Sequence, residues 1–173
     1  MIRLADESDL PAIDGIYDRI HSAEESGTLS IGWQRGIYPT GQTAREAQQA
    51  GELFVLEDGG RIVAAARINK TQMPAYAQIN WKYPAGDDEV MVLHTLTVDP
   101  LFSGQGYGRQ FIAFYERYAM EHGCLTLRID TNAKNTVARA MYARHGYAES
   151  GIVPTVFNGI SAVMLVCMEK RLG

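Results

Sequence analysis

The sequence is poor in the patterns that mark metal sites, membrane spans and nucleic-acid binding. It has only two cysteines in 173 residues, with no CxxC pair or Cys/His cluster, so a metal site of the usual spacing is unsupported. No run approaches the roughly 20 apolar residues of a membrane-spanning helix. Lys and Arg number 16 against 20 Asp and Glu, a formal net charge of -4, which argues against general binding to phosphate backbones. We therefore expect no resident metal, no nucleic-acid partner and no membrane insertion.

The two cysteines, Cys124 and Cys167, lie far apart in apolar stretches, which predicts buried free thiols in a reducing compartment. The first ten residues, MIRLADESDL, are acidic and lack the apolar run of a signal peptide. We therefore expect a cytoplasmic protein. Hydrophobic residues make up 46% and charged residues 21%, a composition that supports one packed domain over residues 1–173.

Hydrophobic periodicity predicts strands and helices that alternate along the chain. Runs rich in β-branched and apolar residues predict strands at residues 2–4, 52–57, 62–69, 89–98, 125–130, 147–153 and 161–170. The last two strands are expected to be joined by a loop around Pro154 and Asn158-Gly159. The alternation predicts an α/β sheet with helices on both faces and a ligand-binding turn between a strand and a helix.

Four helices are expected. The first covers residues 6–24, with Ser8 as its N-cap and an apolar residue every three or four positions. A short helix covers residues 43–51 and is capped by Thr43. The third follows three closely spaced glycines, and the fourth covers residues 135–146 and ends at a glycine.

The three glycines belong to the stretch SGQGYG, residues 103–108, which we call the glycine loop. Glycine costs backbone entropy, so something must require a bare backbone here. The first N–H groups of a helix have no intrahelical partners, and an anion can approach them closely where Cβ atoms are missing. The loop therefore predicts a phosphate or pyrophosphate site.

Two common nucleotide motifs do not fit the glycine loop. A P-loop requires Gly-Lys followed by Ser or Thr, whereas Arg109 and Gln110 follow Gly108. The dinucleotide fingerprint requires GxGxxG after an early strand, whereas this pattern is GxGxG and lies past the middle of the chain. A pyrophosphate attached to something other than a hydrolysed nucleotide fits better.

The glycine loop resembles the [RQ]xxGx[GA] signature of the GNAT superfamily of N-acetyltransferases, with Ser103 where that family usually has Arg or Gln. The stretch NTVARAMYARHGY, residues 135–147, resembles the second signature of the same family in Asn135, Ala138, Tyr142 and Gly146-Tyr147. The two signatures are separated by one helix and one strand, as in the family. The resemblance spans essentially the whole chain.

The resemblance implies a mixed, mostly antiparallel sheet of about seven strands, splayed at the middle and flanked by about four helices. It also implies acetyl-CoA as cosubstrate, direct transfer of the acetyl group to a primary amine of a small molecule or peptide, and possible pairing of two chains through the C-terminal strands. The residues expected to bind acetyl-CoA are Leu96, Thr97, Val98, Ser103, Gly104, Gln105, Gly106, Tyr107, Gly108, Arg109, Asn135 and Tyr142.

Direct transfer needs a proton donor for the leaving thiolate and a base for the amine. Tyr142 is the expected acid, because a phenol is a suitable donor. His94 is the expected base, because its ordinary pKa lies near neutrality and because counting by twos along a strand puts it on one face with Leu96 and Val98. Three carboxylates are open alternatives for the base: Asp88, Glu89 and Asp130.

The acceptor is expected to contact Trp33, Tyr38, Trp81 and Asp130. Residues 25–42 combine glycines with aromatic side chains. They can form a wall over a ligand site, or a surface loop that its own aromatics hold in place, and the sequence leaves both interpretations open. A second function also stays open, a catalytically silent module that binds or senses acyl-CoA.

Overall fold

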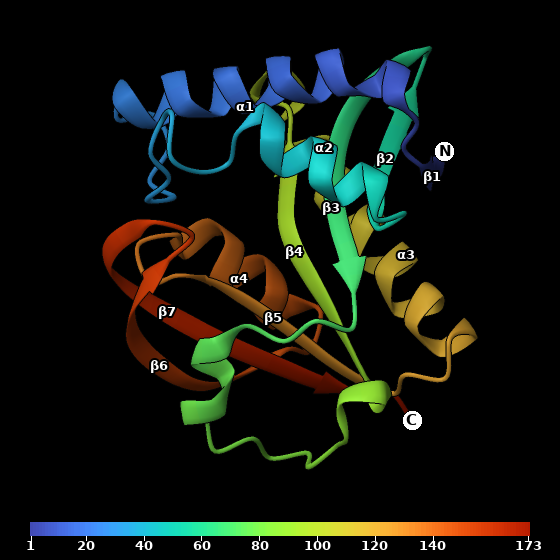
Figure 1. Cartoon of the computed structure of the whole chain (residues 1–173), viewed down its shortest axis with the longest axis vertical. Coiled ribbons are helices and arrows are strands. Elements are labelled where there is room, and N and C mark those ends of the chain that lie inside the picture. The colour runs from blue at the N-terminus through green and yellow to red at the C-terminus, as the bar shows by residue number, and fades with distance from the viewer.

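The computed structural model describes all 173 residues, and its centre is one seven-stranded sheet in the order β1-β2-β3-β4-β5-β7-β6. The strands are β1 (Ile2–Leu4), β2 (Leu53–Asp58), β3 (Arg61–Asn69), β4 (Val90–Val98), β5 (Thr126–Asn132), β6 (Ala148–Phe157) and β7 (Ile160–Arg171). The helices are α1 (Leu10–Glu25), α2 (Gly41–Gln49), α3 (Tyr107–Glu121) and α4 (Thr136–Arg144). Figure 1 shows their arrangement.

All neighbouring strands pair antiparallel except β4 and β5, which are parallel. The expected fold, a mixed and mostly antiparallel sheet of seven strands with four helices, is therefore confirmed. The chain needs a long crossover to return β5 parallel to β4. That crossover contains the glycine loop and α3.

The alternation of side chains along β2 and β3 gives each face of the sheet its own core. Phe54 of β2 packs with α3 in the largest apolar cluster, whereas Val55 packs with α1 and α2 in another. Successive strand residues point to opposite faces, so a strand that is apolar throughout requires cover on both sides. None of the four helices combines the length and the apolarity needed to cross a bilayer.

β4 and β5 diverge after only four paired positions. Their register runs from Val90 opposite Thr126 to Leu93 opposite Ile129 and then ends. Figure 1 shows the two strands diverging from a common start into a V. β4 stays paired with β3 as far as Val98, although the register shifts opposite Ala65 and Arg67. The sheet therefore opens between its two parallel strands, and the resemblance predicted this opening.

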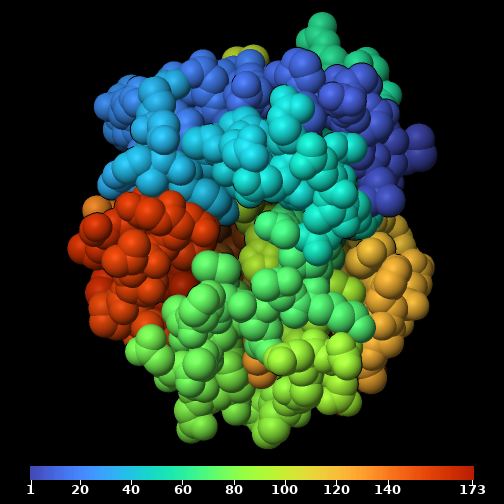
Figure 2. Space-filling model, viewed as in Figure 1, coloured from blue at the N-terminus to red at the C-terminus, as the bar shows by residue number.

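Residues 70–89 cover the face of β4, β5 and β7 opposite α3 and α4. They contain two short 3-10 helices, Pro74–Gln78 and Asp87–Glu89. Tyr76 from this segment packs with Val92 and Leu165 in a third apolar cluster. Figure 2 shows the segment in green, below α2 and beside the β6–β7 hairpin in red.

Two predicted helix starts were wrong. At the N-terminus, Asp6 rather than Ser8 caps the first turn, because its carboxylate accepts from the Ser8 N–H. Before α2, Thr40 rather than Thr43 is the N-cap, and Thr43 is the third residue of a reciprocal capping box. In both places several residues with capping side chains lie close together, and local pattern alone does not decide which one caps.

The predicted loop around Pro154 was also wrong, because Pro154 lies within β6 and only Asn158 and Gly159 form the turn. Proline is tolerated there because β6 is an edge strand, where a missing N–H breaks no ladder on the outer side. The expected buried free thiols are confirmed at Cys124 and Cys167.

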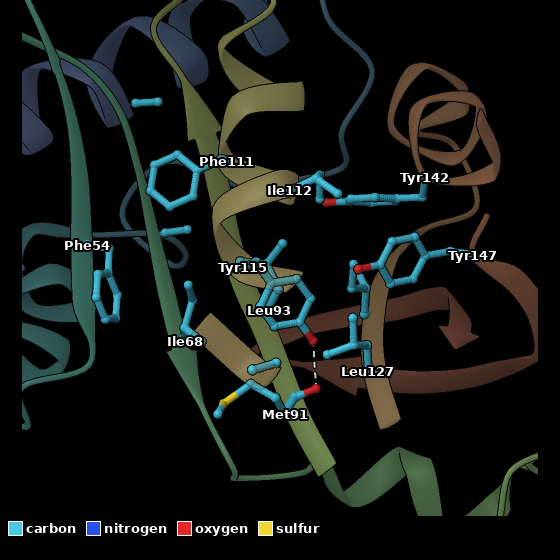
Figure 3. Close-up of a cluster of buried hydrophobic side chains, with 14 of the residues drawn as sticks. Phe54, Ile68, Met91, Leu93, Phe111, Ile112, Tyr115, Leu127, Tyr142 and Tyr147 are labelled. Atoms are coloured by element: carbon cyan, nitrogen blue, oxygen red, sulfur yellow. Dashed lines mark hydrogen bonds between the residues drawn. The ribbon is translucent and has the colours of Figure 1, made fainter. Parts of the chain in front are cut away.

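Tyr115 of α3 joins the two parallel strands just before they diverge. It is completely buried, and its hydroxyl donates to the carbonyl oxygen of Met91 on β4 at 2.6 Å, with the Arg128 carbonyl of β5 at 3.2 Å. Figure 3 shows the Tyr115–Met91 bond within the core.

Replacing Tyr115 with Phe should lower the free energy of unfolding by about 1–2 kcal/mol, because buried carbonyl oxygens lose a hydrogen-bond donor. Urea denaturation measures this change. Tyr118→Phe on the same helix is the control, since its partly exposed hydroxyl makes no hydrogen bond in the chain. Equal losses in both variants would contradict the role of the Tyr115 hydroxyl.

Candidate active site

A cavity of about 410 Å³ lies where β4 and β5 diverge. Its walls come from β4, β5, the start of α3, α4, the β6–β7 hairpin and the glycine-rich segment between α1 and α2 (residues 26–40), which we call the arm. Many of the residues predicted for a ligand site line it: Trp33, Tyr38, Leu96, Thr97, Val98, Gly108, Asp130, Asn135 and Tyr142. The parting of the strands thus brings together side chains that are up to about a hundred residues apart in sequence.

The glycine loop leads from β4 into α3 at one end of this cavity. The backbone N–H groups of residues 104–109 donate to no acceptor in the chain. Gly104 and Gly106 have φ angles of +78° and +81°, in the left-handed region where a side chain is strained. At Gly108 the requirement is space, because a Cβ there would come within 2.9 Å of the Met141 sulfur. Free N–H groups at a helix start form a site for an anion.

The side chains around this loop have different tasks. Arg109 is exposed and forms no ion pair, so its guanidinium is free to meet an anion beside the helix start. The Tyr107 hydroxyl donates to Asp58 of β2, so its side chain holds the loop to the sheet, and its backbone N–H is left without a partner in the chain. Ser103, Gln105 and the loop glycines other than Gly108 lie outside the cavity itself.

α4 brings two predicted residues to the cavity. Asn135 is its N-cap, and the side-chain oxygen accepts from the Ala138 N–H at 3.1 Å. Tyr142 lies two turns later; its ring is buried and extends toward α3 (Figure 3). Its hydroxyl has no hydrogen-bond partner in the chain, and burial, followed by the charge of Asp130, raises its pKa. The phenol is therefore protonated at neutral pH and has a proton available to a ligand.

Asp130 is the one carboxylate among the cavity-lining residues. It lies on β5 just past the last residue paired with β4. The Tyr76 hydroxyl donates to its Oδ2 at 2.7 Å, and no basic side chain forms an ion pair with it. Burial raises the pKa of Asp130 to about 6, and the bond from Tyr76 opposes that rise. Asp130 can therefore exchange a proton near neutral pH.

The arm before α2 forms an aromatic wall of the cavity. Trp33 packs edge-on against Tyr38 with ring centroids 5.9 Å apart, and Tyr38 packs in the same way against Phe157 at 5.5 Å. The Glu24 carboxylate accepts from the Ile31 and Gly32 N–H groups at 2.6 and 2.9 Å, which holds the arm in place. The arm has features of both interpretations, because it lines the cavity and its own aromatic rings pack against one another.

Thr95 is a residue of the site that sequence reasoning missed. Its φ angle is +52°, which is strained for a β-branched residue. It lies where the β3–β4 register shifts, and its hydroxyl bonds to the Tyr38 hydroxyl. The irregularity turns consecutive residues of β4 toward the cavity, so Thr95, Leu96, Thr97 and Val98 all line it.

The same irregularity places His94 elsewhere. Counting by twos fails at Thr95, and His94 lines a separate pocket of about 210 Å³ next to α2 instead of the main cavity. Its Nε2 lies 2.9 Å from the Asn69 side-chain oxygen. Burial, followed by the charge of Arg67, lowers the pKa of His94 to about 4, so the ring is neutral. Its catalytic role stays a prediction, without a place in the cavity to support it.

Trp81 also lies outside the cavity, in the segment that covers the opposite face. Its ring packs against Tyr76 at 5.2 Å, and its Nε1–H donates to the Tyr76 carbonyl at 3.0 Å. The Arg128 guanidinium lies 4.0 Å from the centre of the indole. Trp81 therefore supports Tyr76 and does not itself line the cavity.

The sequence carried little signal for the other lining residues. Asn132 follows Asp130 on β5 and packs against Gly32, where a Cβ would come within 2.3 Å of its side-chain nitrogen. Tyr76, which lies outside the cavity and reaches it through Asp130, is one of several aromatic residues in an irregular segment of the sequence. One pattern in the sequence did point to a lining residue: a polar side chain at the end of an apolar strand, which predicted Asp130.

Comparisons with known proteins agree with this geometry. The sequence matches the model of the acetyltransferase (GNAT) family over residues 16–147. Among curated proteins, none matches the sequence.

Several solved structures share the fold. A GNAT-family acetyltransferase from Streptococcus agalactiae has a TM-score of 0.84 at 21% identity, covering 100% of this chain and 95% of that one. Ribosomal-protein-alanine N-acetyltransferase from Brucella melitensis has a TM-score of 0.72 at 24% identity, covering 99% of both chains. The protein yncA from Salmonella typhimurium, whose structure holds its cofactor acetyl-CoA, has a TM-score of 0.71 at 19% identity, covering 100% and 94%.

The raised pKa of Asp130 predicts how stability depends on pH. The folded state binds the proton more tightly than the unfolded state, so the carboxylate costs no stability below about pH 4 and its full cost appears above about pH 6. Asp130→Asn removes this cost. The change in the free energy of unfolding that the substitution causes should therefore be more favourable at pH 8 than at pH 4, by up to about 3 kcal/mol. Urea denaturation at both pH values measures the difference. The exposed Asp88→Asn is the control, and a pH-independent effect of Asp130→Asn would contradict the prediction.

Proposed function

The chain belongs to the acetyltransferase (GNAT) family, and we propose that it transfers the acetyl group of acetyl-CoA directly to a primary amine of a small molecule or peptide. One observation carries the proposal. The opening between β4 and β5 connects the free N–H groups of the α3 start with a cavity that holds a carboxylate and a phenol. An anion site, a channel and an acid–base pair are the elements that this transfer needs.

The donor would be held at two places. The pyrophosphate suits the N–H groups of residues 104–109, helped by the exposed Arg109. The pantetheine arm suits the opening beside Leu96, Thr97 and Val98, where β4 has no β5 partner. Asn135 already uses its side-chain oxygen to cap α4, so only its amide N–H groups are free to meet the arm.

The reaction divides among few groups. The amine must lose a proton before it attacks the thioester carbonyl, and the developing oxyanion suits a backbone N–H near Val98. Tyr142 would protonate the departing sulfur, because its hydroxyl is neutral, unpartnered and lies at the cavity. Neither cysteine lines the cavity, which favours direct transfer over an acyl-enzyme.

Asp130 is the best supported of the candidate bases. It lies in the cavity, and its pKa of about 6 is suited to accepting a proton near neutrality. Asp88 and Glu89 are exposed and precede β4, at the end where the two strands are still paired. An unpaired carboxylate also attracts a cationic ammonium group, so Asp130 would serve first to dock the acceptor and then to deprotonate it.

The acceptor would enter against Trp33 and Tyr38. These rings and Phe157 form an apolar wall beside the carboxylate. A primary amine with an apolar or aromatic neighbour to its nitrogen fits this combination of one charge and flat surfaces. The pairing of two chains stays a prediction; the edge strand β6 exposes Ile152 and Val156 in support of it.

The donor site can be tested without knowing the acceptor. A ligand at about 100 times its dissociation constant adds roughly 2.7 kcal/mol of apparent stability, so saturating acetyl-CoA should raise the thermal midpoint.

Gly104→Ala should weaken acetyl-CoA binding by about tenfold or more, since a residue with a side chain resists the left-handed backbone that aims the N–H groups. Gly51→Ala is a matched control, because φ is +69° and a Cβ meets nothing within 4 Å, as at Gly104. Wild type that shows no midpoint rise, and no acetylation across a panel of primary amines, would contradict the proposal.

Tyr142→Phe should lower kcat by about 100-fold while leaving acetyl-CoA affinity unchanged, because a general acid acts on the transition state. Tyr147→Phe is the control; Tyr147 is a buried neighbour whose hydroxyl has no partner, so kcat should be retained. A kcat for Tyr142→Phe equal to that of wild type would remove Tyr142 from the mechanism.

A further inference from the structure

Tyr76 holds Asp130 from the face of the sheet opposite α4. It comes from the short 3-10 helix Pro74–Gln78, is 3% exposed, and donates to Asp130 Oδ2 at 2.7 Å. The phenol donates its one proton to Oδ2, so this bond fixes which carboxylate oxygen faces Tyr76. No other side chain or backbone group bonds to Asp130 Oδ1, and Asp130 lines the cavity. The free oxygen is therefore the one available to an acceptor.

The position of Tyr76 is itself fixed by several contacts. Trp81 bonds to the Tyr76 carbonyl and packs on the ring. The guanidinium of Arg128 in turn stacks on the indole of Trp81. The buried Glu169 of β7 accepts from the Lys82 and Tyr83 N–H groups at 2.6 and 3.4 Å. A segment that reads as an irregular surface loop is thus attached to the sheet around one phenol.

The surroundings of Asp130 make this bond important. Four titratable groups face it: Tyr38 from the arm, Tyr76 from the segment of residues 70–89, Tyr142 from α4 and Cys167 from β7. Burial raises the pKa of all four, so each is neutral at pH 7. Burial also favours the protonated form of Asp130, and the Tyr76 bond is the one interaction that favours the charged form.

We propose that Tyr76 is a positioning residue for acetyl transfer, which keeps Asp130 ionised and turns its free Oδ1 toward the acceptor amine. This inference rests on the proposed function. With Oδ2 bonded to Tyr76, an ammonium acceptor gives its proton to Oδ1, the oxygen that no group of the chain contacts by a hydrogen bond. The neutral amine then forms the N–C bond as the C–S bond breaks, and Tyr142 supplies the proton on sulfur. The second proton of the nitrogen restores the Tyr142 phenol, and Asp130 releases its proton to solvent.

The test measures the pKa of Asp130 directly, in protein labelled with ¹³C at the aspartate carboxyls. Asp130→Asn assigns the resonance, which should titrate near pH 6 in wild type. In Tyr76→Phe the pKa should rise by about one pH unit or more, because a hydrogen bond to a charged group is lost. Tyr83→Phe is the control; it makes the same change in the same segment at a hydroxyl that bonds to nothing in the chain, and the pKa should not move. An unchanged pKa in Tyr76→Phe, or an equal rise in Tyr83→Phe, overturns the proposal.

A second measurement keeps every phenol hydroxyl in the protein. Growth on 3-fluorotyrosine makes every phenol a stronger donor, so the Asp130 pKa should fall in otherwise wild-type protein. A pKa that stays the same or rises overturns the proposal even where Tyr76→Phe folds poorly.

Turnover separates this inference from the function on which it rests. With an acceptor found in an amine panel, the acidic limb of kcat/KM should move to higher pH in Tyr76→Phe and activity should recover at alkaline pH. A purely structural role would lower kcat/KM equally at all pH values, and that result overturns the inference. Absence of transfer by wild type would instead remove the proposed function and leave the titration result as it stands.

Discussion

The site depends on the parting of β4 and β5. These two strands share only four paired positions, from Val90 to Leu93 on β4. Parallel strands are normally buried and continuously paired, because an unpaired backbone group away from water is costly. Here each strand keeps a partner only on its outer side beyond that point, β4 with β3 and β5 with β7, and the backbone edge that faces the opening is left without a strand partner. The sheet therefore stays continuous at its base while opening a cavity at its other end.

Groups of opposite charge preference lie along that opening: free N–H groups at the start of α3 and the carboxylate of Asp130. The glycine loop offers unpartnered N–H groups and the positive end of α3, which suits a pyrophosphate. Asp130 offers a carboxylate without a basic partner, which suits an ammonium group. Under the proposed function, the anionic donor and the cationic acceptor would therefore bind at separate ends. The reacting atoms would meet between them, beside the neutral phenol of Tyr142.

Several of these features cost stability and are kept in place by the surrounding fold. Thr95 has a strained backbone, and it is held between His94 and Thr97, which both pair with β3, and by the bond of its hydroxyl to the Tyr38 hydroxyl. Asp130 is a buried carboxylate whose main support is the Tyr76 phenol. Strain and unpaired charge persist only where the neighbouring structure over-determines them. The three apolar clusters and the Tyr115 bond across β4 and β5 provide that rigid surrounding.

The sequence by itself determined the order of strands and helices, the bare helix start at the glycine loop and the family resemblance, because those depend on local periodicity and on contiguous motifs. It also predicted Asp130 and Tyr142 as site residues, since each lies at a recognisable place in its own element, and both line the cavity. Only the tertiary structure decided that His94 and Trp81 lie outside the cavity and that Tyr76 reaches Asp130. A one-residue irregularity at Thr95 reverses the face of every strand position counted across it, and a contact between residues 54 positions apart leaves no local pattern.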